Sequence, residues 1–326
     1  MWMSLAPEIQ ELLDWDERLA RRLDGRSYAE QQAIVYEALE ERARATGLRF
    51  ADVAGIEDRR VPADGRNVRV RVYTPFGRPP HPAFLHFHGG GFVGGSIDWS
   101  HNHAKCAHIC ANAGCVVATV DYRLAPEHSY PAAPEDCYAA LCWLADHATE
   151  LAIDPTRIVV GGESAGGNLA AVTALMVRDR NGPPLTLQLL EVPVTDMSDR
   201  AGTFPSLGLY GRGYGLDRTA IESFQDAYLP DRKLRAEPYA SPLRVSDLSS
   251  VAAAHILTAE YDPLRDSGEA YACRLQEAGV STTLHRYRGH THGSSALWQT
   301  WPPARAWMDE VVAAIRDATR APVAAA

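Results

Sequence analysis

The pattern of apolar and polar residues over the first fifty positions is helical. Apolar side chains recur on one side of residues 7–23, and Pro7 suits the first turn of such a helix. A second helical pattern runs from about residue 28 to residue 46 and stops at Gly47. Neither apolar stripe is long enough for a coiled coil. We therefore expect two helices that pack on a larger body.

A strand-like alternation begins at Arg66, where residues 66–73 read R-N-V-R-V-R-V-Y. Successive side chains of a strand point to opposite faces of a sheet, so Val68, Val70 and Val72 share the inward face. The arginines between them face outward. This pattern predicts a half-exposed strand.

The later strand candidates are short and almost entirely apolar, as expected of strands that are covered on both faces. They lie at residues 83–87, 115–120, 157–160, 185–190 and 255–259, and a further strand is expected at residues 282–287. Helical patterns lie between most of them, at about residues 100–113, 134–150 and 165–179. Alternating strands and helices with short links predict an α/β fold, with a mainly parallel sheet and helices on both faces.

One stretch, residues 196–243, interrupts this alternation with five glycines and many scattered aromatic residues. A long insertion in an α/β chain usually lies at the mouth of an active site. A loose surface loop would explain the glycines but not so many aromatics. We therefore expect a lid or cap that bounds a partly apolar pocket.

Composition narrows the classes of protein. The chain has 326 residues, of which 46% are hydrophobic and 22% charged, as in ordinary globular proteins. Lys and Arg together number 32 against 41 for Asp and Glu, a net charge of −9, so nucleic acid is not an expected partner. Only Lys105 and Lys233 are lysines, a bias that we interpret as codon usage.

Membrane association and a secretory leader are not expected either. The first residues have no basic segment followed by an apolar one, and no stretch holds 18 uninterrupted apolar residues. The expected location is cytoplasmic. The six cysteines form no C-x-x-C pair and mostly have apolar neighbours, which is typical of reduced core thiols rather than of disulfides or a metal site.

Residues 162–166, which read G-E-S-A-G, carry the sharpest chemical signal. They follow the strand pattern at 157–160 and begin an alanine-rich helix pattern. Glycines two positions on either side of Ser164 remove Cβ atoms that would clash in a sharp strand-to-helix turn, so the hydroxyl stands exposed. The helix N-terminus favours developing negative charge. We interpret Ser164 as a nucleophile.

Residues 88–92, which read H-G-G-G-F, end the strand at 83–87 and could form a flexible hinge. With a nucleophile downstream, their bare backbone is better explained as a source of N–H donors for an oxyanion. The expected donors are Gly90, Gly91 and Ala165, with Gly89 as an alternative. We expect His88 to brace this loop rather than to act as a base.

The nucleophile needs a base and a carboxylate, which in this arrangement follow the serine in the order acid, then histidine. Asp262 lies just after the strand at 255–259, whereas Asp266 resembles a helix N-cap with Glu269 as its capping-box partner. We therefore favour Asp262. The histidine follows the next strand, but spacing alone leaves His290 and His292 equivalent.

Several segments together resemble the hormone-sensitive-lipase-like branch of the α/β-hydrolases, which includes many bacterial carboxylesterases. They are H-G-G-G-F at 88–92, D-Y-R-L-A-P-E at 121–127, G-E-S-A-G-G at 162–167 and D-P-L-R-D at 262–266, with P-A-A-P-E-D at 131–136 similar to a helix entry of that family. The likeness spans about residues 60–320.

The resemblance also separates the two histidines, because the family's base stands in a G-x-x-H-G segment that matches residues 289–293 and selects His292. Two positions depart from the family pattern. Glu163 stands where many members have Asp, a change that preserves charge. Ser294 stands where many have Phe, and we expect it to reshape the pocket beside the base and to alter substrate preference rather than mechanism.

The architecture that the resemblance implies is an α/β-hydrolase fold with an eight-stranded sheet. A catalytic domain would span residues 51–195 and 244–326, while residues 1–50 and the inserted segment 196–243 would form the cap. Members of the family are often dimers, so a homodimer is an allowed assembly.

The function expected is that of a serine carboxylesterase acting on small esters with short acyl chains, with no metal or organic cofactor. Sibling activities on the same scaffold are the alternatives: deacetylation, lactone opening, acyl-peptide cleavage or the elimination of water. A ligand-binding, receptor-like member without catalysis is the alternative from another class. The presence of Ser164, Asp262 and His292 together argues against it.

Overall fold

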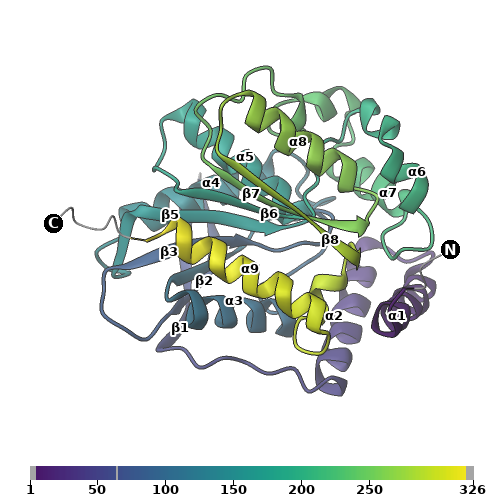
Figure 1. The fold of residues 1–326 in the computed structure, drawn as a ribbon, viewed down its shortest axis with the longest axis horizontal. Helices are drawn as coiled ribbons and strands as arrows, with labels where there is room; N and C mark the ends of the chain where they lie inside the picture. Colours follow the sequence, from purple (N-terminus) through teal and green to yellow (C-terminus); the bar gives the residue numbers. More distant parts are fainter. Residues whose placement is uncertain (1–4, 64, 321–326) are drawn as a thin grey trace.

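Residues 5–63 and 65–320, which the computed structural model describes, form an eight-stranded sheet covered by helices on both faces (Figure 1). The strand order is β1-β2-β4-β3-β5-β6-β7-β8. The strands are β1 (Gly55–Ala63), β2 (Arg66–Thr74), β3 (His81–Phe87), β4 (Val116–Asp121), β5 (Ile153–Glu163), β6 (Leu187–Glu191), β7 (Ala254–Tyr261) and β8 (Thr282–Thr291).

Strands β4, β3, β5, β6, β7 and β8 are parallel, whereas β1 and β2 run antiparallel at one edge. The predicted α/β fold is confirmed, and the predicted strands coincide with β2 to β8 within a few residues. The strand predicted at 157–160 is longer in the structure. Because the carboxyl ends of parallel strands meet at one edge of a sheet, the loops after β3, β5, β7 and β8 come together there.

Strand β1 has no counterpart among the predicted strands. It pairs with β2 on the outer edge of the sheet, and Val61 is its one buried residue. Its sequence, G-I-E-D-R-R-V-P-A, is polar and contains a proline. An edge strand with both faces largely in solvent has no hydrophobic alternation, so periodicity could not reveal it.

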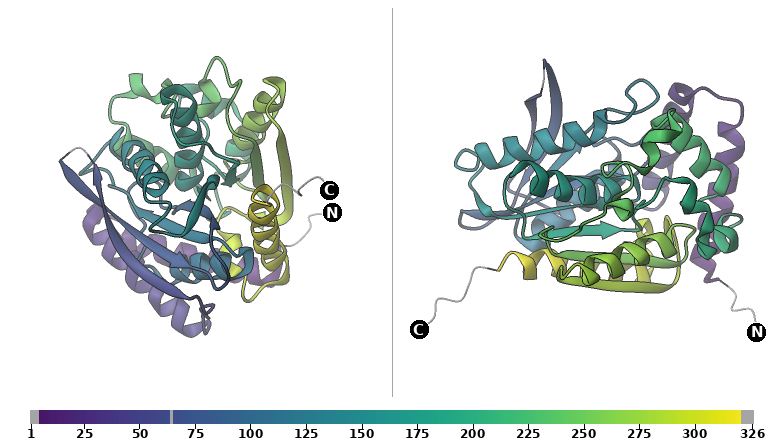
Figure 2. Two further views of the ribbon diagram at one scale, coloured as in Figure 1. Left: turned by 90° about the vertical axis from the view of Figure 1, so that its left-hand side faces the viewer. Right: turned by 90° about the horizontal axis from the view of Figure 1, so that it is seen from above.

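The helices form one layer on each side of the sheet (Figures 1 and 2). On one face α3 (Ser100–Ala113) and α9 (Pro302–Ala318) pack against the side chains that include Phe84. On the other, α4 (Ala132–Asp146), α5 (Ala165–Arg180) and α8 (Arg265–Glu277) pack against those that include Leu85. Neighbouring residues of β3 thus serve opposite cores, which explains why the central strands are apolar throughout.

Two further groups of helices lie side by side at the end of the sheet where the parallel strands finish (Figure 2). The first is α1 (Pro7–Leu23) and α2 (Tyr28–Ala45), and Ser27 caps α2 in a capping box with Glu30. The second follows β6 and comprises η1 (Asp199–Thr203), α6 (Pro205–Tyr210), α7 (Arg218–Tyr228), η2 (Arg232–Ala236) and η3 (Pro242–Arg244). The Tyr28 hydroxyl lies 2.9 Å from the Ser223 hydroxyl and joins the two groups.

The division into a catalytic domain and a two-part cap remains a prediction. Residues 1–4 of the predicted cap and residues 321–326 of the predicted catalytic domain lie outside the described residues. Among the helices of the described residues, none has both the length and the apolar character that a membrane span requires.

Asp136 joins three elements through one fully buried carboxylate. It accepts hydrogen bonds from Arg66 on β2, at 2.6 and 2.9 Å, and from the guanidinium and backbone N–H of Arg123, at 2.9 to 3.0 Å. Removing one partner of a buried ionic network leaves the remaining charges without compensation.

We expect Asp136→Ala to lower the free energy of unfolding by about 3 kcal/mol, because both arginines lose their shared acceptor. Urea denaturation followed by circular dichroism measures the change. Asp146→Ala is the matched control, since Asp146 is exposed at the end of the same helix, and its effect should stay within about 0.5 kcal/mol. Equal denaturation midpoints for the two variants would contradict the role of Asp136.

Candidate active site

Ser164 lies in the sharp turn between β5 and α5, with φ 57° and ψ −114°. A non-glycine residue with positive φ is strained, and the surrounding contacts must hold it. The Ser164 backbone N–H donates to the Glu191 carbonyl at 2.8 Å. A Cβ atom at Gly162 or Gly166 would stand 2.2 or 2.0 Å from the Phe87 carbonyl oxygen, so only glycine fits at either position.

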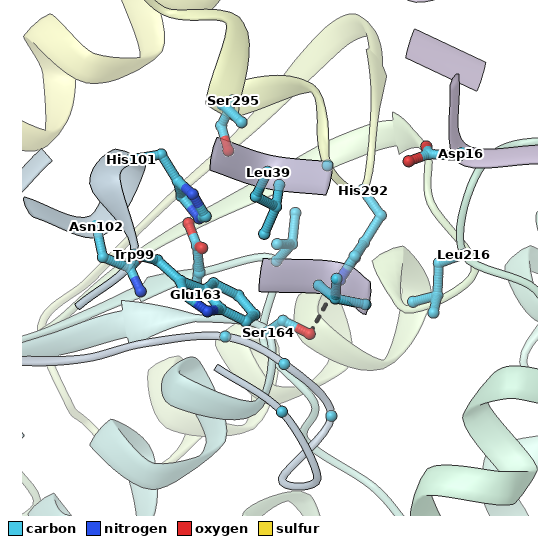
Figure 3. Close-up of a pocket in the computed structure, with 18 of the residues that line it drawn as sticks. Asp16, Leu39, Trp99, His101, Asn102, Glu163, Ser164, Leu216, His292 and Ser295 are labelled. Carbon is cyan, nitrogen blue, oxygen red and sulfur yellow. Dashed lines mark hydrogen bonds between the residues drawn. The ribbon is translucent and has the colours of Figure 1, made fainter. Parts of the chain in front are cut away.

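Ser164, His292 and Asp262 form a continuous hydrogen-bonded chain (Figure 3 draws Ser164 and His292). His292 Nδ1 lies 2.9 Å from Asp262 Oδ2, and His292 Nε2 lies 2.9 Å from Ser164 Oγ. A carboxylate can only accept, so Nδ1 carries the proton and Nε2 is left as the acceptor for the serine hydroxyl. The second oxygen of the buried Asp262 accepts from the Leu264 N–H at 2.8 Å.

The pKa of His292 lies above its ordinary value of 6.5. Burial lowers this pKa, but the negative charge of Asp262 and its hydrogen bond outweigh burial. Glu163 and Asp16 act in the same direction from farther away. The imidazolium is therefore stabilised inside a largely buried site.

His290 and Asp266, the two alternatives for base and carboxylate, point elsewhere. His290 is fully buried at the end of β8 with its Nδ1 2.9 Å from the Ser294 hydroxyl, and burial lowers its pKa to about 4. Asp266 accepts from the Ser206 N–H at 2.8 Å and from Arg265 Nε at 2.8 Å. Neither side chain makes a hydrogen bond to Ser164 or His292 among the described residues.

The interpretation of Asp266 as a helix N-cap is wrong. Helix α8 begins at Arg265, so Leu264 occupies the N-cap position and its N–H is bound by Asp262. Asp266 instead joins the start of α6 to the start of α8. Glu269, the expected capping-box partner, accepts hydrogen bonds from Thr258 on β7 and Arg286 on β8.

The loop after β3 brings Gly89, Gly90 and Gly91 to the wall of the cavity beside Ser164. The N–H groups of Gly90 and Gly91 donate to no acceptor within the described part of the chain. Ala165 is the first residue of α5, where backbone N–H groups have no intrahelical partner. Gly90 has φ 128°, and a Cβ atom there would lie 2.1 Å from the Gly94 carbonyl oxygen.

Side chains from other motifs hold this loop. His88 is buried and stacks on Tyr122 with ring centroids 4.3 Å apart, and the Tyr122 hydroxyl donates to the His88 carbonyl at 2.7 Å. Phe92 stacks on Tyr228 at the end of α7, with ring centroids 4.0 Å apart. The bracing role predicted for His88 agrees with these contacts, and the loop is tied to both the sheet and the inserted segment.

A buried ionic cluster that the sequence did not reveal lies next to the nucleophile. The Lys105 ammonium contacts Glu163 at 2.9 Å and Glu191 at 2.8 Å, and the Trp307 indole N–H donates to the second oxygen of Glu191 at 2.7 Å. Burial opposes both charges, yet the carboxylates raise the pKa of Lys105 above its usual value, and Lys105 lowers the pKa of Glu163 to about 2. Lys105 is therefore the cation of this cluster, while the small number of lysines in the chain remains interpreted as codon usage.

Ser294 does not line the cavity, contrary to what was expected of it, and its effect on substrate preference stays a prediction. Its side chain is fully buried, and its hydroxyl bonds to His290 and to the backbone of Thr291, away from the cavity. Among the described residues that line the cavity, the neighbours Gly293 and Ser295 are present and Ser294 is not. Ser294 therefore contacts residues on the far side of the base from the cavity.

The cavity above Ser164 has a volume of about 470 Å³ (Figure 3). Its walls come from α1, α2, the glycine loop, the start of α3, α7 and the segment after His292. Most of the side chains are apolar, among them Leu12, Leu39, Trp99, Leu216 and Phe224. Figure 3 shows Asp16 and Leu216 on the side of Ser164 where His292 stands, with Trp99, His101 and Asn102 on the other side.

Within residues 5–63 and 65–320 no group of three or more His, Cys, Asp or Glu side chains is arranged to hold a metal ion. All six cysteines carry free thiols, four of them fully buried.

A family model described as alpha/beta hydrolase fold matches residues 84–295. The chain belongs to the α/β-hydrolase family. The resemblance to the hormone-sensitive-lipase-like branch of this family is thereby confirmed.

Curated α/β-hydrolases and solved structures resemble the chain over most of its length. It is 40% identical over 267 residues to the carboxylic ester hydrolase LipN of Mycobacterium tuberculosis, covering 80% of this chain and 70% of the relative. It is 40% identical over 244 residues to an arylesterase of Saccharolobus solfataricus, covering 74% and 77%. A hyperthermophilic esterase of the archaeon Pyrobaculum calidifontis superposes with a TM-score of 0.87 at 36% identity, covering 97% of this chain and 99% of that one.

We expect Lys105→Met to destabilise this α/β-hydrolase by about 3 kcal/mol, because the buried Glu191 and the partly buried Glu163 would remain as neighbouring carboxylates without a cation. Lys233→Met is the matched control, since the chain has only these two lysines and Lys233 is exposed. Urea denaturation at neutral pH compares the two variants. A loss below 1 kcal/mol for Lys105→Met would mean that the cluster does not hold the fold.

Proposed function

We propose that this chain is a serine carboxylesterase that hydrolyses small esters with short acyl chains through an acyl-enzyme intermediate. Ester hydrolysis is the activity named for its relatives at about 40% identity. The observation that carries the proposal is the hydrogen-bonded chain from Asp262 through His292 to Ser164, which ends at a serine facing a cavity.

In the proposed mechanism the Ser164 hydroxyl attacks the ester carbonyl while His292 Nε2 takes its proton. Asp262 keeps the proton on Nδ1 and stabilises the imidazolium that forms. His292 then gives the proton to the leaving alcohol, and in the second half of the reaction it activates the water that releases the acid. These steps need no group beyond the three side chains and water.

The oxyanion is assigned to the N–H groups of Gly90, Gly91 and Ala165, with Gly89 as the alternative donor. Support comes from the unpaired N–H groups of the glycine loop and from the position of Ala165 at the start of α5. Donors that are already oriented stabilise the tetrahedral intermediate without reorganisation, and loss of one such donor typically costs about 3–4 kcal/mol of barrier.

The cap is assigned to residues 1–50 and 196–243, whose helices supply part of the cavity wall. Support for short acyl chains comes from the cavity volume of about 470 Å³ and its mainly apolar lining. A homodimeric assembly and a cytoplasmic location are also part of the expectation and stay predictions.

Ser164→Ala should abolish hydrolysis of p-nitrophenyl acetate, with a fall in kcat of about 10⁶-fold, because the nucleophilic oxygen is gone. Release of p-nitrophenol measures the rate, and mass spectrometry after reaction with a phosphonate ester should find the label on Ser164 of the wild type only. Inactivity of the folded wild type across ester lengths would favour a ligand-binding protein instead.

The matched pair for the base is His292→Ala and His290→Ala in the same assay. The first should behave like Ser164→Ala, whereas the second should keep most of the activity of the fraction that folds. The opposite result would assign the base to His290.

The pH dependence of kcat/KM should follow His292, which acts only when it is neutral. Since the pKa of His292 lies above 6.5, kcat/KM should rise through a midpoint above pH 6.5 and be lost as the pH falls. Asp262→Asn removes the charge that raises this pKa and leaves burial to lower it. The midpoint should then move to a lower pH, with a rate about 10⁴-fold smaller. A midpoint that stays unchanged in Asp262→Asn would contradict the assignment of this carboxylate.

A further inference from the structure

Asp16 is an acidic side chain in the wall of a mainly apolar cavity. It projects from α1 and lines the cavity together with Leu12, Trp15 and Leu216. Within the described part of the chain its carboxylate makes no hydrogen bond and no ion pair. A carboxylate that faces an otherwise apolar part of the cavity can pair with a cationic group of a molecule bound there.

The charged groups that face Asp16 come from two other elements. Arg42 projects from α2, but its guanidinium lies over the Trp15 ring, 4.8 Å from the centroid, rather than against the carboxylate. His292 lies on the loop after β8, and its charge and that of Asp16 influence each other. From the inserted segment, Gly215 approaches so closely that a Cβ atom there would stand 3.0 Å from Asp16 Oδ2.

The direction of an ester in the cavity follows from the proposed function. The carbonyl oxygen points to the N–H groups of Gly90 and Gly91, and the leaving oxygen must come within reach of His292 Nε2 to receive its proton. The alcohol portion therefore extends on the side of His292. Figure 3 shows Asp16 and Leu216 on that side. The acyl portion then extends in the opposite direction, towards Trp99 and His101.

We propose that Asp16 determines specificity for the alcohol portion of the ester and favours leaving alcohols that carry an ammonium group over neutral alcohols of the same shape. This inference rests on the proposed esterase function. Apolar walls with one unpaired carboxylate suit an alkylammonium group, because the alkyl part contacts Leu12 and Leu216 while the cation lies against the carboxylate.

The preference should depend on pH. Burial raises the pKa of Asp16 to about 6, although the charges of Arg42 and His292 lower it. The carboxyl group is therefore charged well above pH 6 and neutral well below it. A cationic leaving group also meets Arg42 and His292 as like charges, which limits the gain to about ten-fold in a partly solvated site.

The test compares 2-(trimethylammonio)ethyl acetate with 3,3-dimethylbutyl acetate, two esters of the same shape that differ by one positive charge. The ratio of their kcat/KM values is measured at pH 8 and at pH 5 by acetate release. Titration of His292 affects both esters alike and cancels in this ratio. Asp16→Asn is the test variant, and Asp14→Asn is the control because Asp14 is exposed on the same helix.

In the wild type and in Asp14→Asn the ratio should be about ten-fold higher at pH 8 than at pH 5, and in Asp16→Asn it should not change with pH. A ratio independent of pH in the wild type would overturn the inference, as would a lower ratio at pH 8. Equal losses on both esters in Asp16→Asn would mean that Asp16 acts only through His292, and would overturn it too.

The neutral ester separates this inference from the proposed function. If the folded wild type does not turn over 3,3-dimethylbutyl acetate, or if Ser164→Ala does so equally well, the proposed esterase function fails and this inference fails with it. Turnover that depends on Ser164 but shows no charge preference overturns the role of Asp16 alone.

Discussion

The active-site region depends on one close approach, in which the carbonyl oxygen of Phe87 occupies the space where side chains of residues 162 and 166 would stand. Through this contact the end of β3 packs against the turn between β5 and α5. It places the glycine loop beside Ser164 and leaves the serine in a strained backbone conformation. The parallel sheet then supplies the remaining groups, because β7 and β8 end at the same edge.

Much of this arrangement could be predicted from local sequence. Short apolar runs predict the buried strands, and the G-E-S-A-G segment between a strand and a helix predicts the turn because only glycine fits its geometry. Chain order leaves both Asp262 and Asp266 as candidates for the carboxylate, and Asp262 is favoured partly because Asp266 is interpreted as a helix N-cap, which is wrong. The residues alone could not separate His290 from His292, since both follow the same strand, and a resemblance to known relatives was needed.

What the sequence does not reveal depends on contacts between distant segments. Lys105, Glu163 and Glu191 come from a helix and two strands, and nothing local marks them as partners. In the sequence, Asp16 cannot be distinguished from the other polar residues of an amphipathic helix. Only the packing of α1 in the fold places its side chain at the cavity. The edge strand β1 has no buried face that periodicity could detect. The direction of the Ser294 side chain depends on the turn after β8, so the sequence could not show that this side chain points away from the cavity.

The Lys105 cluster also limits which amino-acid substitutions this protein can accept during evolution. Replacement of Lys105 alone leaves Glu163 and Glu191 without a cation, whereas replacement of either glutamate alone leaves Lys105 paired with the other carboxylate. An apolar residue at position 105 is therefore expected only where both carboxylates have been replaced as well, while either glutamate can change first. Homologues that keep the hydrolytic machinery but have no cation at position 105 should therefore also have no carboxylate at positions 163 and 191.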